Sequence, residues 1–199
     1  MTSAMETRTR RSGRETRELI EQESLRLFAE KGVDGTSVRD IALAVGVADA
    51  ALYRHFESKD AIAGEIFAKH YGVLARSIRE ITEEPEPFRR KVADLVALFC
   101  HLFDDSPDVF RFILVHQHAH LDKIDDADNV VEQLAQMMRR AITDGDIAVK
   151  DANLAAAMAL GAVVQPAVFR LYGRLGGPLG PMSQRIATSV LAALTTDMV

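Results

Sequence analysis

Apolar residues recur along most of this chain at the three- and four-residue spacing of amphipathic helices. The first predicted helix spans residues 13–31 and ends at Gly32. Its inner face holds Leu19, Ile20, Ser24, Leu27 and Phe28. Two short helices are predicted near residues 37–44 and 48–55, and a longer helix begins at Ser58.

The second half of the chain continues this pattern, with no alternating segments that would indicate β-strands. Pro85 and Pro87 mark a break after the long helix, and the Gly- and Pro-rich residues 173–181 mark another. Further helices are predicted over residues 88–104, 107–121, 129–144, 151–172 and 181–197. The sequence therefore predicts an all-α protein.

The turn between the two short helices is closely specified. Ser37 can cap the first helix, with Asp40 reaching back as an imperfect capping box. Gly46 stands where the chain turns sharply, a position that tolerates little but glycine. Leu52 and Phe56 then supply the buried side of the second helix. This pattern predicts a helix-turn-helix, whose second helix enters the major groove of DNA.

A longer array of residues around this motif resembles the DNA-binding region of tetracycline-repressor (TetR) family transcriptional regulators. The array comprises residues 27–32, 36–42, 46–47, 52–56 and 58–59. The resemblance covers roughly residues 14–66, and the rest of the chain is similar to the family in length and helical character. It implies an N-terminal three-helix helix-turn-helix domain and a C-terminal helical domain for ligand binding and dimerisation.

The predicted domains are a disordered basic arm over residues 1–12, a DNA-binding domain over 13–57, and an effector-binding and dimerisation domain over 58–199. By resemblance, the last two helices pair in a homodimer that binds a palindromic operator in double-stranded DNA. The small or apolar residues expected to allow this pairing are Ala155, Ala156, Ala159, Gly161, Ala162, Ile186, Val190, Leu191 and Leu194.

The net charge of −5 is unusual for a DNA-binding protein until it is mapped along the chain. Residues 1–17 hold five arginines against two glutamates, a local charge of +3, so the rest of the chain has −8. The single cysteine, Cys100, excludes a disulfide within the chain and favours a reducing compartment. No apolar run approaches the ~20 residues of a membrane span, and the N-terminus lacks an apolar signal core. We therefore expect a cytoplasmic protein without a membrane partner.

The resemblance also implies which residues of the motif contact DNA. Ser37 and Arg39 would lie near the DNA backbone, and Lys59 would face a phosphate at the start of the long helix. Tyr53 and His55 would lie on the DNA side of the second short helix. The alternatives are a core position for Tyr53 and a structural hydrogen bond for His55.

The second helix departs from the family pattern at residues 48–51. Ala48 lacks the usual capping hydroxyl, unless Asp49 serves instead. Asp49 could also accept hydrogen bonds from base amino groups or favour the helix N-terminus. Ala50 and Ala51 cannot hydrogen-bond a base, but they can pack against a thymine methyl group.

Arginines supply the remaining candidate contacts with DNA. Arg54 is the best candidate for a guanine or a phosphate contact. Arg8, Arg10 and Arg11 of the arm could enter the minor groove, or they could form a merely solvated charge run.

The second half contains a histidine cluster but no catalytic constellation. His116 and His120 would share a helical face, whereas His118 would point away. Two histidines at this spacing can bind zinc or nickel, but a site needs further ligands. The alternative is a polar patch that lines a pocket or faces solvent. Because no phosphate loop, triad or paired-carboxylate site is recognisable, we predict no enzyme, no cofactor and no metal centre.

Aromatic and methionine side chains are spread over the C-terminal helices, which suits a pocket for an apolar or amphipathic effector. The predicted ligand contacts are Phe67, Tyr71, Phe103, Phe112, His116 and Met137. Tyr71 or His116 would orient the ligand, and the alternative for each residue is a place in the core.

Together these features predict a ligand-responsive, sequence-specific DNA-binding transcriptional regulator. A repressor that a small organic effector releases from its operator is favoured by the resemblance. The alternative is an effector-independent architectural DNA-binding protein, which would have a filled core and weak sequence discrimination.

Overall fold

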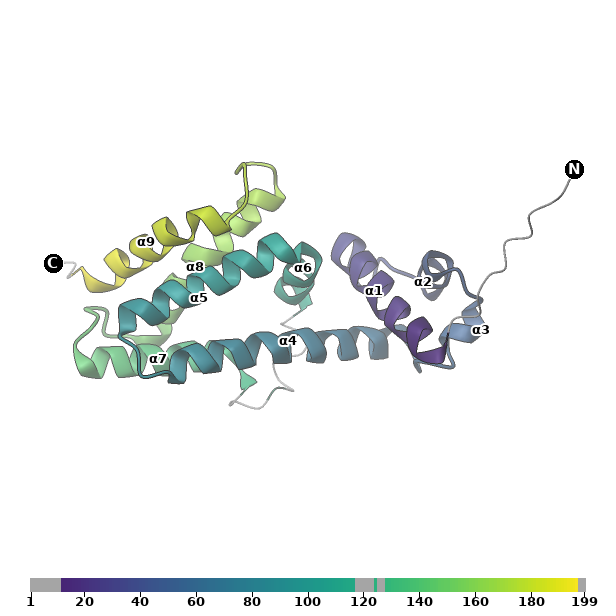
Figure 1. Ribbon diagram of the computed structural model, residues 1–199, viewed down its shortest axis with the longest axis horizontal. Coiled ribbons are helices and arrows are strands. Elements are labelled where there is room, and N and C mark those ends of the chain that lie inside the picture. Colours follow the sequence, from purple (N-terminus) through teal and green to yellow (C-terminus); the bar gives the residue numbers. More distant parts are fainter. Residues whose placement is uncertain (1–11, 117–123, 125–127, 197–199) are drawn as a thin grey trace, which may run out of the picture. The chain divides into compact units, whose positions relative to one another are not determined.

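A computed structural model of the chain describes residues 12–116, 124 and 128–196. No described residue lies in a β-strand, which confirms the predicted all-α class. The α-helices are α1 (Gly13–Lys31), α2 (Val38–Val45), α3 (Asp49–Leu52), α4 (Lys59–Glu83), α5 (Phe88–Asp105), α6 (Pro107–His116), α7 (Val130–Asp144), α8 (Ala152–Leu171) and α9 (Ser183–Thr195), with a 3₁₀ turn at Gly180–Met182 (Figure 1).

The observed helices lie close to the predicted ones, with two differences. The second short helix was predicted over residues 48–55, but α3 ends at Leu52 and residues 53–55 form a turn. The helix predicted over residues 107–121 is described as far as His116, and its remainder lies outside the described residues.

The chain forms two compact units, residues 1–66 and 67–199. The division lies within α4, so this uninterrupted helix contributes its first turns to one unit and its later turns to the other. The predicted boundary after residue 57 had assigned the whole helix to the second part.

The N-terminal unit surrounds a single apolar core. The Ser12 hydroxyl accepts a hydrogen bond from the Glu15 amide (3.2 Å), and the Glu15 carboxylate accepts one from the Ser12 amide (2.7 Å). This capping box starts α1, which packs against α2, while α2 packs against α3. The almost fully buried side chains of the core are Ile20, Phe28, Ile41, Leu52, Phe56, Ile62 and Ile66.

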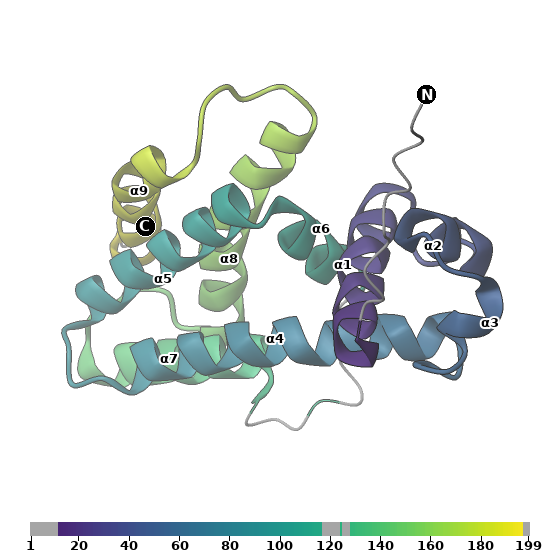
Figure 2. The same ribbon diagram turned by 45° about the vertical axis from the view of Figure 1, so that its right-hand side comes forward.

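The C-terminal unit is built on two long helix pairs, α5 with α9 and α7 with α8, and α8 also packs against α9 (Figure 2). Asp104 near the end of α5 accepts hydrogen bonds from the amides of Leu179 (2.9 Å) and Gly180 (2.7 Å). These bonds hold the connection between α8 and α9 against α5. Cys100 of α5 is fully buried, and burial raises the pKa of its thiol to about 11.

The hydropathy of α8 corrects one statement made from the sequence. An 18-residue window of this helix, Ala152–Leu171, has a mean hydropathy of 1.6, so the helix is long and apolar enough to cross a membrane. The prediction that no run approaches that length was therefore wrong. A helix in the interior of a protein meets the same two criteria, so hydropathy alone does not assign α8 to a membrane. In this structure α8 packs against α5, α7 and α9.

Candidate nucleic-acid interface and ligand cavities

The helix-turn-helix begins with the predicted capping box. The Ser37 hydroxyl accepts from the Asp40 amide (3.1 Å), and the Asp40 carboxylate accepts from the Ser37 amide (2.9 Å). The carboxylate also accepts from the Ser37 hydroxyl (2.7 Å). Hydrogen bonds from the side chain and then the backbone of Ser37 lower the pKa of Asp40, because they favour its charged form. The aspartate therefore replaces the usual glutamate without loss of the motif.

Gly46 forms the turn between α2 and α3. Its φ of 76° and ψ of 38° lie in the left-handed region, as the sequence predicts for a sharp turn. The amides of Gly46 (2.9 Å) and Val47 (3.0 Å) both donate to the Ala42 carbonyl. The turn thus satisfies a backbone acceptor at the end of α2 and fixes where α3 starts.

The start of α3 lacks a side-chain cap. Ala48 occupies the N-cap position and makes no side-chain capping bond, and Asp49 is the first residue inside the helix. Asp49 therefore does not replace the missing hydroxyl, although its charge suits the N-terminus of a helix. Beyond Leu52, the amides of Tyr53 and Phe56 continue to bond to carbonyls of the preceding turn.

Most of the predicted DNA contacts in this motif lie on its outer surface. Leu52 (0% exposed) and Phe56 (3%) fill the core side, whereas Tyr53 is 55% exposed and is not a core residue. The exposed members of the predicted set are Ser37, Arg39, Asp49, Ala50, Tyr53 and Arg54, and the half-buried members are Ala51, His55 and Lys59. Arg8, Arg10 and Arg11 lie outside the described residues.

Lys59 has a structural bond that the sequence did not predict. Its ammonium group donates to the Val33 carbonyl (2.5 Å), which joins the start of α4 to the loop after α1. A lysine ammonium has three N–H donors, so two of them still point elsewhere. The predicted phosphate contact and this internal bond are therefore compatible.

Arg17 makes contacts that were not predicted from the sequence, where this arginine was counted with the basic arm. Its guanidinium donates to the His55 carbonyl (2.6 Å) and pairs with Glu65 of α4. The same group lies over the Phe56 ring, 4.1 Å from the ring centre. One side chain of α1 thus holds the turn after α3 and the first turns of α4 in place.

The start of α1 lies beside the second half of the motif. A Cβ atom at Gly13 would lie 3.9 Å from Cε1 of His55. The predicted arm therefore joins the folded domain next to a residue predicted to lie on the DNA side.

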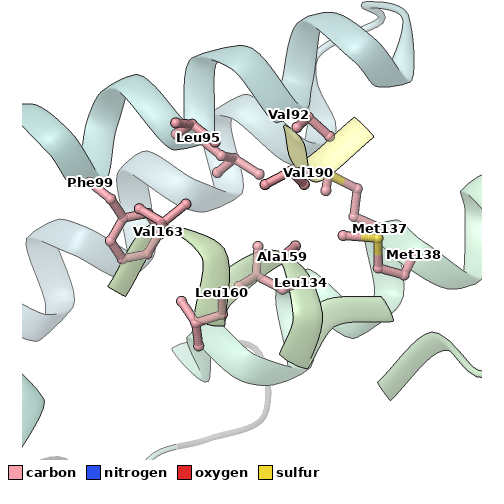
Figure 3. A pocket seen from close by; sticks show the side chains of 11 residues that line it. Val92, Leu95, Phe99, Leu134, Met137, Met138, Ala159, Leu160, Val163 and Val190 are labelled. Atoms are coloured by element: carbon pink, nitrogen blue, oxygen red, sulfur yellow. The ribbon is translucent and has the colours of Figure 1, made fainter. Parts of the chain in front are cut away.

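Two apolar cavities adjoin each other inside the C-terminal unit. The first, of about 30 Å³, lies between α5, α7, α8 and α9, and Figure 3 shows its side chains converging on one space. The second, of about 50 Å³, lies among residues of α4–α8. Phe99 and Leu160 line both. Neither wall contains a charged residue, and Tyr71 is the polar side chain of the second wall.

These walls include two of the six predicted ligand contacts. Tyr71 lines the second cavity and Met137 the first. The Tyr71 hydroxyl accepts from the Val130 amide (3.1 Å), and burial raises the pKa of this phenol. The hydroxyl proton remains available to a ligand.

The other four predicted ligand contacts do not line these two cavities. Phe67, Phe103 and Phe112 are buried and pack against other aromatic rings. Phe67 stacks on Tyr71, and Phe103 meets Phe110 edge-on. The ring centres of Phe112 and His116 are 4.6 Å apart. The walls are mainly aliphatic instead, and α5 alone contributes Val92, Leu95 and Val96. The helical spacing of these three residues predicts a buried face but not a cavity.

Residues 20–66 match the family model described as bacterial regulatory proteins, tetR family. This segment contains the capped α2, the left-handed Gly46 turn and the exposed face of α3. This segment is therefore similar to the DNA-binding region of TetR-family regulators. TetR-family proteins are DNA-binding regulators rather than enzymes, in agreement with the class of function predicted from the sequence.

A curated TetR-type relative matches beyond this segment. It is the HTH-type transcriptional repressor KstR2 of Rhodococcus jostii (strain RHA1), which is 38% identical over 96 residues, 48% of this chain and 46% of KstR2. The chain thus spans about half the length of this curated relative.

Solved TetR-type structures extend the likeness to almost the whole chain. The ketosteroid transcriptional regulator KstR2 of Mycobacterium tuberculosis has a TM-score of 0.75 at 20% identity, covering 91% of this chain and 95% of that one. The transcriptional regulator FadR from Bacillus subtilis has a TM-score of 0.72 at 19% identity, covering 89% and 98%. These values confirm the fold, a helix-turn-helix domain followed by a helical domain.

Within the described part of the C-terminal unit, α8 and the residue after it expose an apolar stripe. The stripe consists of Leu154 (53% exposed), Met158 (38%), Phe169 (48%) and Tyr172 (72%), which recur on one helical face. The residues that the sequence suggested for helix pairing include Ala155, Ala156, Val190 and Leu194, and each of these is at most 4% exposed. Packing within the chain already buries these four residues. Of the other predicted residues, Gly161 is exposed and Ala159, Ala162, Ile186 and Leu191 are half-buried, so these five still offer surface to a second copy.

The histidine cluster contributes no metal site to the described part of the chain. Within residues 12–116, 124 and 128–196, no group of three or more His, Cys, Asp or Glu side chains could hold a metal ion. His118 and His120 lie outside these residues.

Gly46→Val is expected to destabilise the TetR-type head by about 1–3 kcal/mol, because a β-branched residue is strained at positive φ. No atom lies within 4 Å of a Cβ at this position, so the cost comes from the backbone and not from a clash. Gly46→Asn, which tolerates this conformation, should lose much less. Urea unfolding followed by circular dichroism measures both, and equal stability of the two variants would contradict the assigned turn.

Proposed function

We propose that this protein is a dimeric transcriptional repressor that leaves a palindromic operator when a small apolar or amphipathic molecule enters its C-terminal unit. The observation that supports it most is the outer face of the helix-turn-helix. Arg39 of α2 is exposed there, as are Tyr53 and Arg54 of the turn after α3, whereas Ile41, Leu52 and Phe56 fill the core side. The three exposed side chains have no role in packing and are free to contact DNA.

The DNA contacts proposed for this face follow the prediction from the sequence. Ser37, Arg39 and Lys59 contact phosphates, while Tyr53 and Arg54 reach base edges or phosphates. The remaining proposed contacts are Asp49, Ala50, Ala51 and His55, together with Arg8, Arg10 and Arg11 of the arm. The position of Gly13 next to His55 supports the role of the arm. The basic segment thereby joins the domain beside the face of the helix-turn-helix that we propose contacts DNA.

Repression and dimerisation rest on further observations. The relative from Rhodococcus jostii is named a transcriptional repressor. The exposed stripe of Leu154, Met158, Phe169 and Tyr172 gives α8 an apolar face for a second copy of the chain. A two-fold dimer presents two recognition helices, which requires an operator with two-fold symmetry. The protein would act on DNA in the cytoplasm.

The effector proposal rests on the two apolar cavities. The FadR structure is of a complex with stearoyl-CoA, and KstR2 is named a ketosteroid regulator, so both neighbours are linked to largely apolar molecules. Cavities of about 30 and 50 Å³ admit little more than single water molecules. A ligand must therefore separate the helices around Phe99 and Leu160. This gives it unequal affinity for the closed and widened states, which is the condition for a shift between them.

The small cavities also support the rival function, an architectural DNA-binding protein that has no effector. The two proposals differ in sequence discrimination, because a repressor must distinguish its operator from other DNA.

Selection of DNA from a random duplex library tests the proposal. We expect enrichment of an inverted repeat whose half-sites lie about 10 base pairs apart, one helical turn, because a two-fold dimer imposes this symmetry. Binding of the selected duplex and of a scrambled duplex is then compared at equal salt. Equal affinity for both would exclude the repressor and support the architectural rival. Enrichment of a sequence without two-fold symmetry would contradict the palindromic operator and the dimer that reads it.

A further inference from the structure

A third, polar cavity lies between the later turns of α4 and the exposed side of α7. Its volume is about 360 Å³, several times that of either apolar cavity. Arg79 and Glu83 of α4 face it, as do Gln133, Gln136 and Arg140 of α7. Its size suits the polar part of a small molecule better than a few ordered waters.

The polar cavity and the first apolar cavity share one residue, Met137. This side chain is 4% exposed, and on the same helix Leu134 and Met138 face the apolar side, as Figure 3 shows. Methionine is unbranched and has three side-chain torsions, so it can swing aside at low cost. Met137 is therefore the partition between a polar and an apolar space.

The three cavities are linked through shared wall residues. The polar cavity adjoins the first apolar cavity at Met137, and the first adjoins the second at Phe99 and Leu160. Tyr71 and Phe110 line the second apolar cavity and neither of the other two. A series of linked narrow spaces suits a long, flexible chain better than a broad, rigid ring system.

The charges around the polar cavity favour an anion. Two arginines and one glutamate line it, which leaves one net positive charge. Arg79 pairs with Asp128 (2.5 Å), whereas no described carboxylate pairs with Arg140. The Lys91 ammonium lies nearby and donates to the Thr82 carbonyl (2.8 Å). Glu83 is the acidic group that an anion must avoid, and Arg140 is the cation best placed to bind it.

We propose that the polar cavity binds the anionic head group, carboxylate or phosphate, of a long-chain amphiphile whose alkyl chain passes Met137 into the apolar cavities. This inference rests on the proposed function and specifies the class of its effector. Arg140 supplies the charge contact, and Gln133 and Gln136 offer amide groups beside it.

Calorimetric titration of the 199-residue chain tests this assignment with three probes. They are dodecanoate and dodecyl phosphate, each below its micellar concentration, and neutral dodecanol below its solubility limit. Arg140→Gln is expected to weaken one or both anionic probes by about tenfold and to leave dodecanol unchanged, because it removes a charge-assisted bond. The two anionic probes distinguish a carboxylate head group from a phosphate. Arg139→Gln is the matched control. Arg139 immediately precedes Arg140 in α7, pairs with Glu132 and does not line the cavity.

A second variant tests the path of the chain. Ala159→Phe fills the first apolar cavity, so it should weaken all three probes without changing the head-group preference. Equal loss in the Arg139 and Arg140 variants, or equal affinity of all probes for the parent and Arg140→Gln, would overturn the head-group assignment. Absence of binding by every probe would overturn it as well. None of these results affects the DNA selection. That selection is measured without ligand and therefore tests the proposed DNA-binding function separately.

Discussion

Phe169→Arg is expected to convert the proposed dimer into a monomer and thereby to remove tight binding to the proposed palindromic operator. Phe169 is 48% exposed in the C-terminal half of the α8 stripe, so a second copy of the chain on this stripe would bury it. A buried, unpaired charge costs about 3–5 kcal/mol, which raises the dissociation constant of the dimer at least about a hundredfold. A monomer also binds one half-site at a time and loses the gain from linked binding. Sedimentation equilibrium and operator titration measure the two effects.

Val73→Arg is the matched control for this variant. Val73 is 54% exposed on α4 and lies outside the α8 stripe, so the same charge is added to an equally exposed apolar position. We expect this control to stay dimeric. A dimeric Phe169→Arg protein with a parental operator affinity would show that the stripe is not the interface.

Arg17→Gln is expected to loosen the recognition segment and to weaken operator binding by about tenfold or more. The substitution removes a charged hydrogen bond to the His55 carbonyl and the cation–π contact with Phe56. Such a bond contributes about 1.5–3 kcal/mol, and the ring contact about 0.5–1 kcal/mol at a partly exposed site. The exposed pair with Glu65 adds little. Hydrogen exchange should quicken at the amides of residues 53–56 and remain unchanged in the C-terminal unit.

Arg14→Gln provides the comparison, because Arg14 lies one turn earlier on α1 and pairs with Glu18 in solvent. Arg17→Lys keeps the charge but lacks the forked donors that reach two partners at once, so it should recover only part of the affinity. If Arg17→Gln leaves the exchange rates of residues 53–56 at the parental values, the positioning role is wrong.

Features fixed within a few residues were predictable from the sequence. The Ser37–Asp40 bonds and the left-handed Gly46 follow from the chemistry of a cap and of a turn, which neighbouring residues determine. The ends of most helices were predictable for the same reason, because a glycine, a proline or a capping residue marks them. The length of α3 was not, since no residue after Leu52 shows where its helical bonds give way to a turn.

Contacts between distant residues were not predictable. The Arg17 guanidinium finds partners 38 and 48 residues away, and no local pattern connects them. Helix α8 is apolar around much of its circumference, so periodicity could not distinguish buried Ala155 from exposed Met158. The cavities posed the same problem, because a wall of leucine and valine has the same sequence pattern as a filled core.

The burial of Cys100 has a practical consequence for measuring how far apart the two heads lie. The chain has one cysteine, and its thiol is both fully enclosed and, at a pKa of about 11, almost entirely protonated near neutral pH. Thiol-directed spin labels or fluorophores should therefore leave the natural residue untouched. A new cysteine at Leu43, which is 81% exposed on α2, would be modified selectively. Each dimer would then hold one reporter per head, and the distance between them could be followed as a ligand is added, with no need to remove the native thiol first.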